Sequence, residues 1–424
     1  MVYHYPHSEY FSDWEKPDFK TLNGQLVLWG AGKVGELAAH CLNKLGVNFL
    51  AFVDSAENRW ATSYCEHRVI SPKELKEDYP NAAILISNSF PAGTYSALEE
   101  LGFNNVYDCS SLFMEIDFTG YNYSMSVEFA ARNAVSYLRN LMLYKGKAQT
   151  LERIIFVINQ KCSLYCKNCD GYTPYLLNPV NYDAGEIIQS AEVLFNAIGF
   201  IEYIDLMGGE PLLHKDLKVI LNYFISSKNV NLVTLVTNGT IVPSSELLTL
   251  MQSSKFVCRI SDYGVLSSKL GRLVEIFRKM NIKFEITNYQ SWDSLTTLQK
   301  TNETAEELDN KFSNCTANVL YYQAGKVAYC RTVNALSNVG KEVLPKSDNN
   351  YLDLYDEHGS IIKNARERIV RFCDRLYARK HIDACQYCNG SHCLQFRDRV
   401  PVAEQADDHL SLDDLYIKEW IGEY

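Results

Sequence analysis

Apolar and polar residues alternate along the chain in a pattern that predicts short strands separated by amphipathic helices. The clearest alternation covers residues 151–300, where apolar runs predict strands at 153–158, 201–207, 232–237, 256–261 and 282–287. Between two of these runs, Leu217, Leu221 and Phe224 recur at helical spacing. Such alternation forms a parallel sheet covered by helices, with sites in the loops at the carboxyl ends of its strands.

A second α/β unit is predicted near the N-terminus. An apolar run at 26–29 is followed by Gly-Ala-Gly-Lys-Val-Gly at 30–35, a helical pattern, and a strand at 49–53 that ends in an acid. Glycines in this order let backbone N–H groups approach a diphosphate, and the acid can bind ribose hydroxyls. The candidate nucleotide-binding residues are Gly30, Gly32, Gly35 and Asp54. A Rossmann-like scaffold without a ligand is the alternative interpretation.

Three cysteines within eight residues follow the predicted strand 153–158. They are Cys162, Cys166 and Cys169, spaced C-x3-C-x2-C. Thiolates this close share a metal centre or a disulfide, and three is an odd number for disulfides. On a four-iron cluster, three thiolates would leave one iron open to a chelating ligand. A zinc knuckle is the alternative, although zinc sites usually take four ligands from paired motifs.

This spacing, with Tyr165 before the second cysteine, resembles the signature of the radical S-adenosylmethionine (SAM) superfamily. A second segment, Gly208-Gly209-Glu210-Pro211, follows the strand 201–207 and resembles the motif that binds the amino group of SAM. The resemblance implies a partial (β/α)6 barrel and a [4Fe–4S] cluster on the three cysteines. It also implies that an electron from the cluster cleaves bound SAM to a 5′-deoxyadenosyl radical.

The next two predicted strands also end in polar residues. The resemblance assigns contacts with SAM or substrate to these strand ends, whereas turn and capping chemistry is the alternative. The full set of candidate SAM-binding residues is Tyr165, Gly208, Gly209, Glu210, Pro211, Thr237, Asn238, Ser261 and Asp262.

A second group of cysteines lies in the last third of the chain. A predicted hairpin around Gly325 ends in a cysteine, with the spacing C-x9-G-x4-C, and resembles the auxiliary-cluster extensions of the SPASM and twitch types. Too few cysteines follow for a full SPASM domain, so the resemblance implies one auxiliary [4Fe–4S] cluster. Its expected ligands are Cys315, Cys330, Cys385 and Cys388, with Cys393 or Cys373 as possible replacements. A zinc ribbon is the alternative.

The composition of the chain excludes some classes of binding partner. The 424 residues carry a formal charge of −10 and no basic block, which argues against binding a nucleic-acid backbone. No apolar stretch approaches the ~18 residues of a membrane span. With thirteen cysteines and no signal peptide expected, we predict a cytoplasmic protein. The acidic tail from residue 404 is expected to pack on the body as a solvated helix; capping of the active site and binding of a partner are the alternatives.

We expect an N-terminal Rossmann-like domain, a linker helix, a radical SAM core and an auxiliary-cluster domain, at residues 1–120, 121–150, 151–300 and 301–424. The first domain resembles modules attached to sugar-modifying enzymes. We therefore predict an oxidoreductase that abstracts hydrogen from a sugar or nucleotide-linked small molecule, with a flavodoxin- or ferredoxin-type electron donor. The alternatives are a peptide-modifying radical SAM enzyme and an iron–sulfur electron-transfer protein without SAM turnover.

Overall fold

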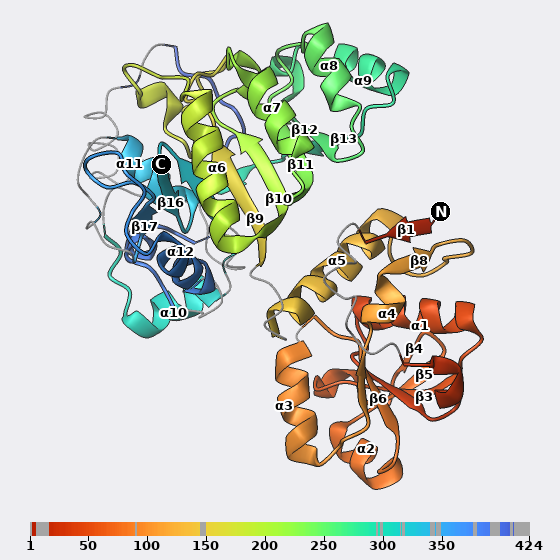
Figure 1. Cartoon of the computed structure of the whole chain (residues 1–424). Helices are drawn as coiled ribbons and strands as arrows, with labels where there is room; N and C mark the ends of the chain where they lie inside the picture. The colour runs from red at the N-terminus through yellow and green to blue at the C-terminus, as the bar shows by residue number, and fades with distance from the viewer. Residues whose placement is uncertain are drawn as a thin grey trace. The chain divides into compact units, whose positions relative to one another are not determined.

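The computed structural model describes two compact units, Met1–Thr150 and Leu151–Tyr424 (Figure 1). The described residues are 2–5, 17–89, 91–144, 150–293, 296, 300–313, 315, 319–339, 344, 349–375, 380–390, 399–407 and 410. Among them, no helix is both long enough and apolar enough to cross a membrane.

The first unit is built on a six-stranded sheet in the order β4-β5-β3-β2-β6-β7. All neighbouring strands are parallel except the short edge pair β4-β5. The strands are β2 (Leu26–Trp29), β3 (Phe49–Val53), β4 (Ser63–Tyr64), β5 (His67–Ile70), β6 (Ala83–Ile86) and β7 (Val106–Asp108). A separate two-stranded ribbon joins β1 (Val2–His4) and β8 (Glu115–Asp117). The parallel strands therefore have an order that also occurs in Rossmann-like sheets, and the Rossmann-like domain remains a prediction.

Alternate residues of these strands are buried on opposite faces of the sheet. One face, with Leu26 and Leu28, packs against α1 (Lys33–Leu45), α4 (Ser110–Phe113) and α5 (Val127–Tyr144). The other face, with Val27 and Trp29, packs against α2 (Pro72–Asp78) and α3 (Pro91–Leu101). Helix α5, predicted as a linker, therefore contributes its apolar stripe to the core of the first unit.

The glycine loop brings the end of β2 against the start of α1. A Cβ on Gly35 would overlap the carbonyl oxygen of Gly30 and lie 3.0 Å from the ring of Phe52. Gly30 itself has φ of +130°, a conformation that favours glycine. In contrast, a Cβ on Gly32 would meet only Arg59, at 3.6 Å. The tight helix–strand contact thus depends on the third glycine of the motif.

We therefore expect Gly35→Ala to destabilise the first unit by about 1–3 kcal/mol, because the added methyl group overpacks the contact. The measurement is denaturant unfolding of the purified protein, followed by near-UV circular dichroism. Gly32→Ala is the matched control and should unfold near the wild-type midpoint. Equal stability of the two variants would contradict this account of the loop.

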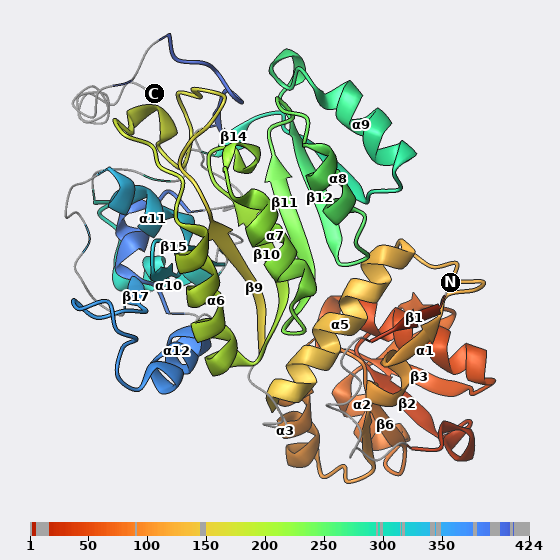
Figure 2. The same cartoon turned by 45° about the horizontal axis from the view of Figure 1, so that its top comes forward.

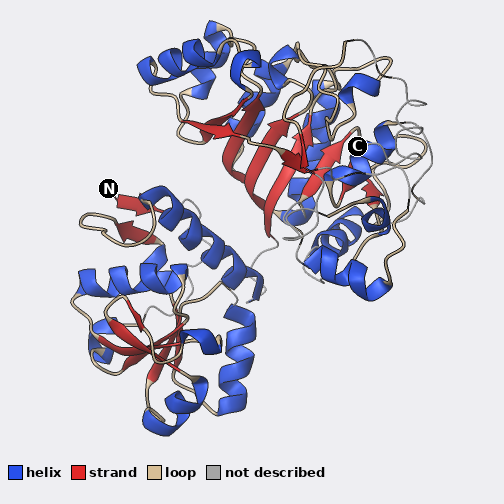
Figure 3. Cartoon of the chain, turned by 180° about the vertical axis from the view of Figure 1, so that it is seen from behind, coloured by secondary structure: helices blue, strands red, loops and turns tan. Residues whose placement is uncertain are grey.

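The second unit contains an eight-stranded sheet in the order β13-β12-β11-β10-β9-β15-β16-β17 (Figure 3). Its parallel part includes β9 (Thr150–Val157), β10 (Phe200–Met207), β11 (Val230–Thr237), β12 (Phe256–Asp262) and β13 (Phe284–Asn288). The hairpin strands are β15 (Leu320–Gln323), β16 (Lys326–Ala328) and β17 (Tyr351–Asp353). The result is the predicted α/β fold with a partial barrel that is not closed.

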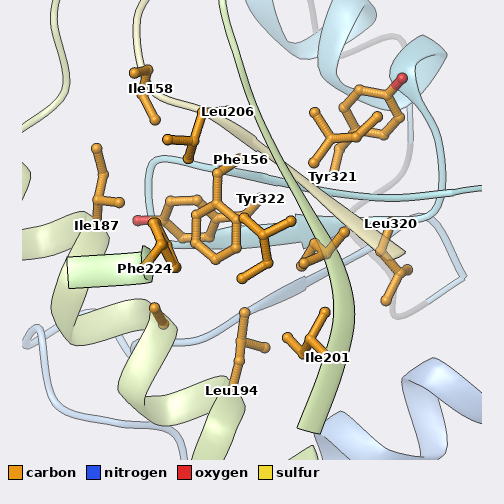
Figure 4. Close-up of a cluster of buried hydrophobic side chains, with 14 of the residues drawn as sticks. Phe156, Ile158, Ile187, Leu194, Ile201, Leu206, Phe224, Leu320, Tyr321 and Tyr322 are labelled. Atoms are coloured by element: carbon orange, nitrogen blue, oxygen red, sulfur yellow. The ribbon is translucent and has the colours of Figure 1, made fainter. Parts of the chain in front are cut away.

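Helices on the outside of this sheet alternate with its strands (Figure 2). They are α6 (Ala184–Ile198), α7 (Leu217–Ser226), α8 (Ser245–Met251) and α9 (Leu270–Lys279). Helix α6 begins where Asp183 accepts the N–H of Glu186 at 3.1 Å and ends at Gly199, which has a positive φ of 80°. The rings of Phe156, Phe224 and Tyr322 meet beneath these helices, with centroids 4.9 and 4.8 Å from Phe156 (Figure 4).

The region beyond residue 300 shares the sheet of the core. Strand β15 pairs in parallel with β9, and a short ribbon joins β14 (Trp292–Asp293) to β18 (Arg399–Val400). The remaining helices are α10 (Ala305–Ser313), α11 (Arg331–Asn338) and α12 (Ala365–Asp374). The domain boundary at residue 300 therefore remains a prediction, while the sheet continues across it.

Candidate functional site

A cavity of about 290 Å³ lies at the carboxyl ends of β9, β10, β11 and β12. Its lining includes most of the candidate residues: Cys162, Cys166, Cys169, Gly208, Gly209, Thr237, Asn238 and Ser261. These residues lie at the carboxyl ends of four neighbouring parallel strands or in the loops that follow them, which is where the alternation of strands and helices predicts a site. The two motifs, far apart in sequence, thus line one cavity.

Each of the three cysteine thiols has a polar partner: two accept an N–H group, and the third donates to a hydroxyl. The amide of Asn238 donates to Sγ of Cys162 at 3.7 Å, and Gln405 donates to Sγ of Cys166 at 3.3 Å. The thiol of Cys169 lies 3.6 Å from the hydroxyl of Thr173. Burial raises the pKa of Cys162 to about 12 and that of Cys166 to about 11. Binding to a metal would therefore displace protons from these thiols.

The two glycines after β10 lie against the backbone that follows β9. A Cβ on Gly208 would overlap the side chain and the carbonyl of Asn159, and one on Gly209 would overlap the carbonyl of Lys161. Two backbone hydrogen bonds tie the segments together: Gly209 N to Asn159 O at 3.2 Å and Glu210 N to Lys161 O at 2.7 Å. Only glycine allows this close approach, which leaves the backbone facing the cavity.

Glu210 is fully buried and joins three strand ends. Its carboxylate accepts the hydroxyl of Thr237 at 2.9 and 3.0 Å, the N–H of Asn238 at 2.8 Å and the N–H of Leu212 at 3.1 Å. Burial raises the pKa of Glu210, and these hydrogen bonds lower it in part. Glu210 and Thr237 therefore hold the shape of the cavity rim, with Asn238 reaching from it to Cys162.

Besides Glu210, three candidate residues do not line the cavity. Asp262 accepts the N–H of Gly264 at 2.8 Å, a turn-stabilising contact. The side chain of Tyr165 is 45% exposed, and Pro211 begins a 3₁₀ turn, Pro211–Leu213. For these residues the structure provides turn and surface contacts but no contact with the cavity.

His214, close to the glycine motif, has a structural role. Its Nε2 lies 2.8 Å from the carbonyl of Tyr182, and its Nδ1 accepts the N–H of Asp216 at 3.1 Å. Only the neutral ring makes both contacts, and burial lowers the pKa of His214 accordingly. The imidazole is thus occupied by the backbone and does not line the cavity.

Arg331 lines the cavity but was missed by sequence reasoning. Its guanidinium pairs with Asp170 at 2.8 Å and interacts electrostatically with Cys169, while its Nε has no hydrogen-bond partner among the described residues. It directly follows Cys330, the first residue before α11. Its position next to Cys330 was the only hint in the sequence. An arginine after a cysteine is too common a pair to predict a site.

The four expected auxiliary ligands lie near one another. Burial raises the pKa of Cys330 well above its usual range, and the thiols of Cys385, Cys388 and Cys315 raise it further. Burial, with the thiols of Cys388 and Cys315, raises the pKa of Cys385 to about 12. The hairpin β15–β16 supplies the second of these cysteines, and the 3₁₀ turn Asp383–Tyr387 carries the third.

Backbone and lysine contacts hold the loop that carries the last two of these cysteines. Lys311 donates to the carbonyls of Cys385 at 3.1 Å and Cys388 at 2.7 Å, and it pairs with Glu303. The N–H of Gly390 donates to Sγ of Cys388 at 3.2 Å. Cys373 instead lies in the hydrophobic core of the second unit, and Cys393 lies outside the described residues.

In the first unit, the carboxylate of Asp54 in the glycine motif already accepts hydrogen bonds from the protein. Asp54 accepts the N–H of Ala31 at 3.0 Å and that of Ala56 at 2.9 Å, and it pairs with Arg59 at 3.2 Å. Arg59 also donates to the carbonyl of Ala31, inside the glycine loop. A ribose would have to displace these contacts, so nucleotide binding by Gly30, Gly32, Gly35 and Asp54 remains a prediction.

The chemistry of the donor set fits iron–sulfur clusters. Each group offers buried or partly buried cysteines together with N–H groups that donate to sulfur, and such surroundings stabilise cluster thiolates. Among the described residues, no three His, Cys, Asp or Glu side chains come close enough to share a single metal ion. Thiols of a cluster bind different irons, so their sulfur atoms need not meet at one point.

Comparison with known proteins gives two matches to protein families. The family described as the radical SAM superfamily matches residues 156–261, and the family described as C2185-like, N-terminal, matches residues 22–105. No curated protein matches the sequence.

Several solved structures are similar to this chain at low identity. Streptococcus suis SuiB bound to S-adenosylmethionine is 14% identical with a TM-score of 0.30, over 52% of this chain and 47% of that one. BtrN in complex with AdoMet and 2-DOIA is 16% identical with a TM-score of 0.37, over 61% and 98%. anSMEcpe with bound AdoMet and Kp18Cys peptide is 15% identical with a TM-score of 0.36, over 64% and 96%. The chain thus spans about half the length of SuiB.

Proposed function

The chain contains a radical SAM domain, matched over residues 156–261, and from this premise we propose that it cleaves SAM reductively at the cysteine cavity. Cys162, Cys166 and Cys169 would hold the [4Fe–4S] cluster that such domains carry. The observation that carries the proposal is the meeting of these thiols with Gly208 and Gly209 in one cavity of about 290 Å³. The test is formation of 5′-deoxyadenosine from SAM and reductant.

When bound, the cluster and SAM would supply an electron and a 5′-deoxyadenosyl radical able to take a hydrogen atom from the substrate. The chain's own residues bind and orient these groups. Backbone groups at Gly208 and Gly209 face the cavity without side chains, so they can approach an ammonium group. Glu210 keeps this backbone in position through its hydrogen bonds to Leu212, Thr237 and Asn238.

The auxiliary group is proposed on Cys315, Cys330, Cys385 and Cys388, with Cys393 as a possible replacement. If all its irons are held by protein, its role would be to accept the electron left on the substrate, giving a net oxidation. The proximity of these four partly buried cysteines supports the proposal. Arg331 directly follows Cys330 in the sequence, and its guanidinium interacts with Cys169. The start of α11 therefore lies between the two groups of cysteines.

We predict about eight irons per chain in anaerobically reconstituted protein, because two four-iron clusters are expected. A double variant, Cys385→Ser with Cys388→Ser, should retain about four, measured by iron and sulfide analysis with metal determination. Cys373→Ser is the matched control, since Cys373 lies in the hydrophobic core, and it should retain about eight. Zinc together with about four irons in the wild type would favour the zinc-ribbon alternative.

For the substrate, we propose a hydroxylated small molecule, a sugar or a nucleotide-linked sugar. A pocket of about 30 Å³ adjoins the larger cavity, and both are lined by Thr173, Gly208, Gly209 and Arg331. Around it, four polar atoms lack partners among the described residues: Oδ1 of Asn159, Oε1 of Gln323, Nε of Arg331 and Nδ2 of Asn334. Two of these atoms are hydrogen-bond acceptors and two are donors. A substrate hydroxyl can both donate and accept, so it could pair with either kind.

The substrate class can be tested by substrate-dependent 5′-deoxyadenosine formation under anaerobic conditions. UDP-, GDP-, CDP- and dTDP-sugars would be compared with the free sugars and with short peptides. Stimulation by one sugar or sugar nucleotide supports the proposal. Stimulation by peptides alone would favour a peptide-modifying enzyme, and no 5′-deoxyadenosine under any condition would favour an electron-transfer protein.

A further inference from the structure

Residues 399–407, which we call the strap, cross the cysteine loop and are anchored beside the cavity. Strand β18 (Arg399–Val400) pairs in antiparallel fashion with β14 (Trp292–Asp293), and the guanidinium of Arg399 pairs with Asp293. Both residues of β14 line the cavity that holds the three cysteines. One end of the strap is therefore fixed to the wall of the site.

The other end of the strap is hydrogen-bonded on both sides of the central cysteine. The N–H of Lys167 donates to the carbonyl of Glu404 at 2.7 Å, and the N–H of Ala406 donates to that of Tyr165 at 2.7 Å. Between these bonds, Cys166 and Gln405 form an antiparallel bridge. Ala403 of the strap is buried with Leu164 and Cys166 in one small hydrophobic cluster.

The side chain of Gln405 has a defined orientation toward sulfur. Its Oε1 accepts the N–H of Tyr165 at 2.8 Å, while its Nε2 donates to the carbonyl of Ala403 at 2.7 Å and to Sγ of Cys166 at 3.3 Å. Exchanging the amide oxygen and nitrogen would set acceptor against acceptor at Ala403 and donor against donor at Tyr165. The N–H group must therefore face the thiol.

From these contacts we propose that the strap completes the site of the first cluster and that Gln405 is a positioning residue that tunes it. This inference rests on the proposed function, because it requires a cluster on Cys166. An N–H donor stabilises negative charge on sulfur. The reduced cluster carries more negative charge than the oxidised cluster, so the donor stabilises the reduced state more. Gln405 therefore raises the reduction potential, and the strap limits the access of solvent to Cys166.

The first test compares full-length, reconstituted Gln405→Glu with the wild type. Glutamate keeps the acceptor for the N–H of Tyr165 but loses the donor to sulfur and adds negative charge. At a fixed solution potential we expect the ratio of reduced to oxidised first cluster to fall about tenfold, a shift of about 59 mV for one electron. EPR spectra with and without SAM identify the first cluster, since SAM changes only the cluster that binds it. Gln405→Met, which lacks the donor without the added charge, should shift in the same direction.

The second test measures solvent access as the rate at which an iron chelator removes iron. Ala406→Pro lacks the N–H that donates to Tyr165, so several-fold faster loss of iron from the first cluster is expected. Glu404→Gln is the matched control for both tests, because it breaks only the exposed pair of Glu404 with Lys167, at 2.7 Å, and keeps the backbone bonds.

The possible results separate the two proposals. If the Gln405 variants keep the wild-type reduced fraction and Ala406→Pro keeps the wild-type rate of iron loss, the strap inference is wrong while SAM cleavage stands. If the wild type binds no cluster on the three cysteines and forms no 5′-deoxyadenosine, the proposed function itself fails.

Discussion

Replacing Cys166 by alanine is expected to reduce 5′-deoxyadenosine formation to background, a loss of at least about a hundredfold. Changes to residues that only support a metal ligand already cost about 10–100-fold in metal affinity or activity, and Cys166 is proposed as a ligand itself. Its thiol also joins the cysteine loop to the strap through Gln405. The measurement is chromatographic detection of 5′-deoxyadenosine from SAM and dithionite under anaerobic conditions.

Cys258→Ala is the control for this prediction. Cys258 is buried, but it lies within β12 and does not line the cavity. Its loss should lower stability by the removal of a small buried group and leave the yield of 5′-deoxyadenosine per folded protein unchanged. Persistence of the product in Cys166→Ala, with the control unaffected, would rule out the first cysteine group as the site of SAM cleavage.

The second large effect is expected for Gly209→Ala. A Cβ at this position would overlap the carbonyl of Lys161, which is backbone and cannot rotate away. The segment after β10 would have to move from the end of β9 and break the bond from Glu210 N to Lys161 O, 2.7 Å long. We therefore expect SAM binding to fall by at least about tenfold, a loss of about 1.4 kcal/mol, with the iron content retained.

Equilibrium binding of SAM to the reconstituted protein measures this effect, together with iron analysis. Gly271→Ala is the matched control. Gly271 lies in α9, and an added Cβ would have no atom within 4 Å, so the affinity for SAM should not change. Wild-type SAM affinity in Gly209→Ala would show that the backbone after β10 does not need this close approach. Loss of iron as well would indicate that the whole cysteine loop had moved.

Much of the architecture follows from sequence periodicity. Apolar runs with helical patterns between them predicted the parallel core sheet, and β9 to β12 lie within a few residues of the predicted strands. The carboxyl ends of parallel strands meet at one edge of a sheet, so the sequence predicts that Cys162 and Gly208 lie close together. The cavity that both residues line agrees with that expectation.

Other features depend on contacts that no local pattern encodes. Helix α5 has the same apolar stripe whether it links domains or packs within one, and only its contacts with α1 and α3 assign it to the first unit. The carboxylate of Asp54 matched the nucleotide motif by its position, yet its hydrogen bonds go to Ala31 and Ala56. Sequence spacing locates such a group without specifying its partners.

By itself, the sequence determined the chemistry: which residues are thiols, how they are spaced, and that they follow buried strands. Only the tertiary structure decided which distant residues surround them, because the path of the chain after residue 300 lacks a regular period. Arg331 contacts Asp170 across 161 residues of sequence, and Gln405 contacts Cys166 across 239 residues. Such contacts arise from packing the whole second unit, and a short segment carries no trace of them.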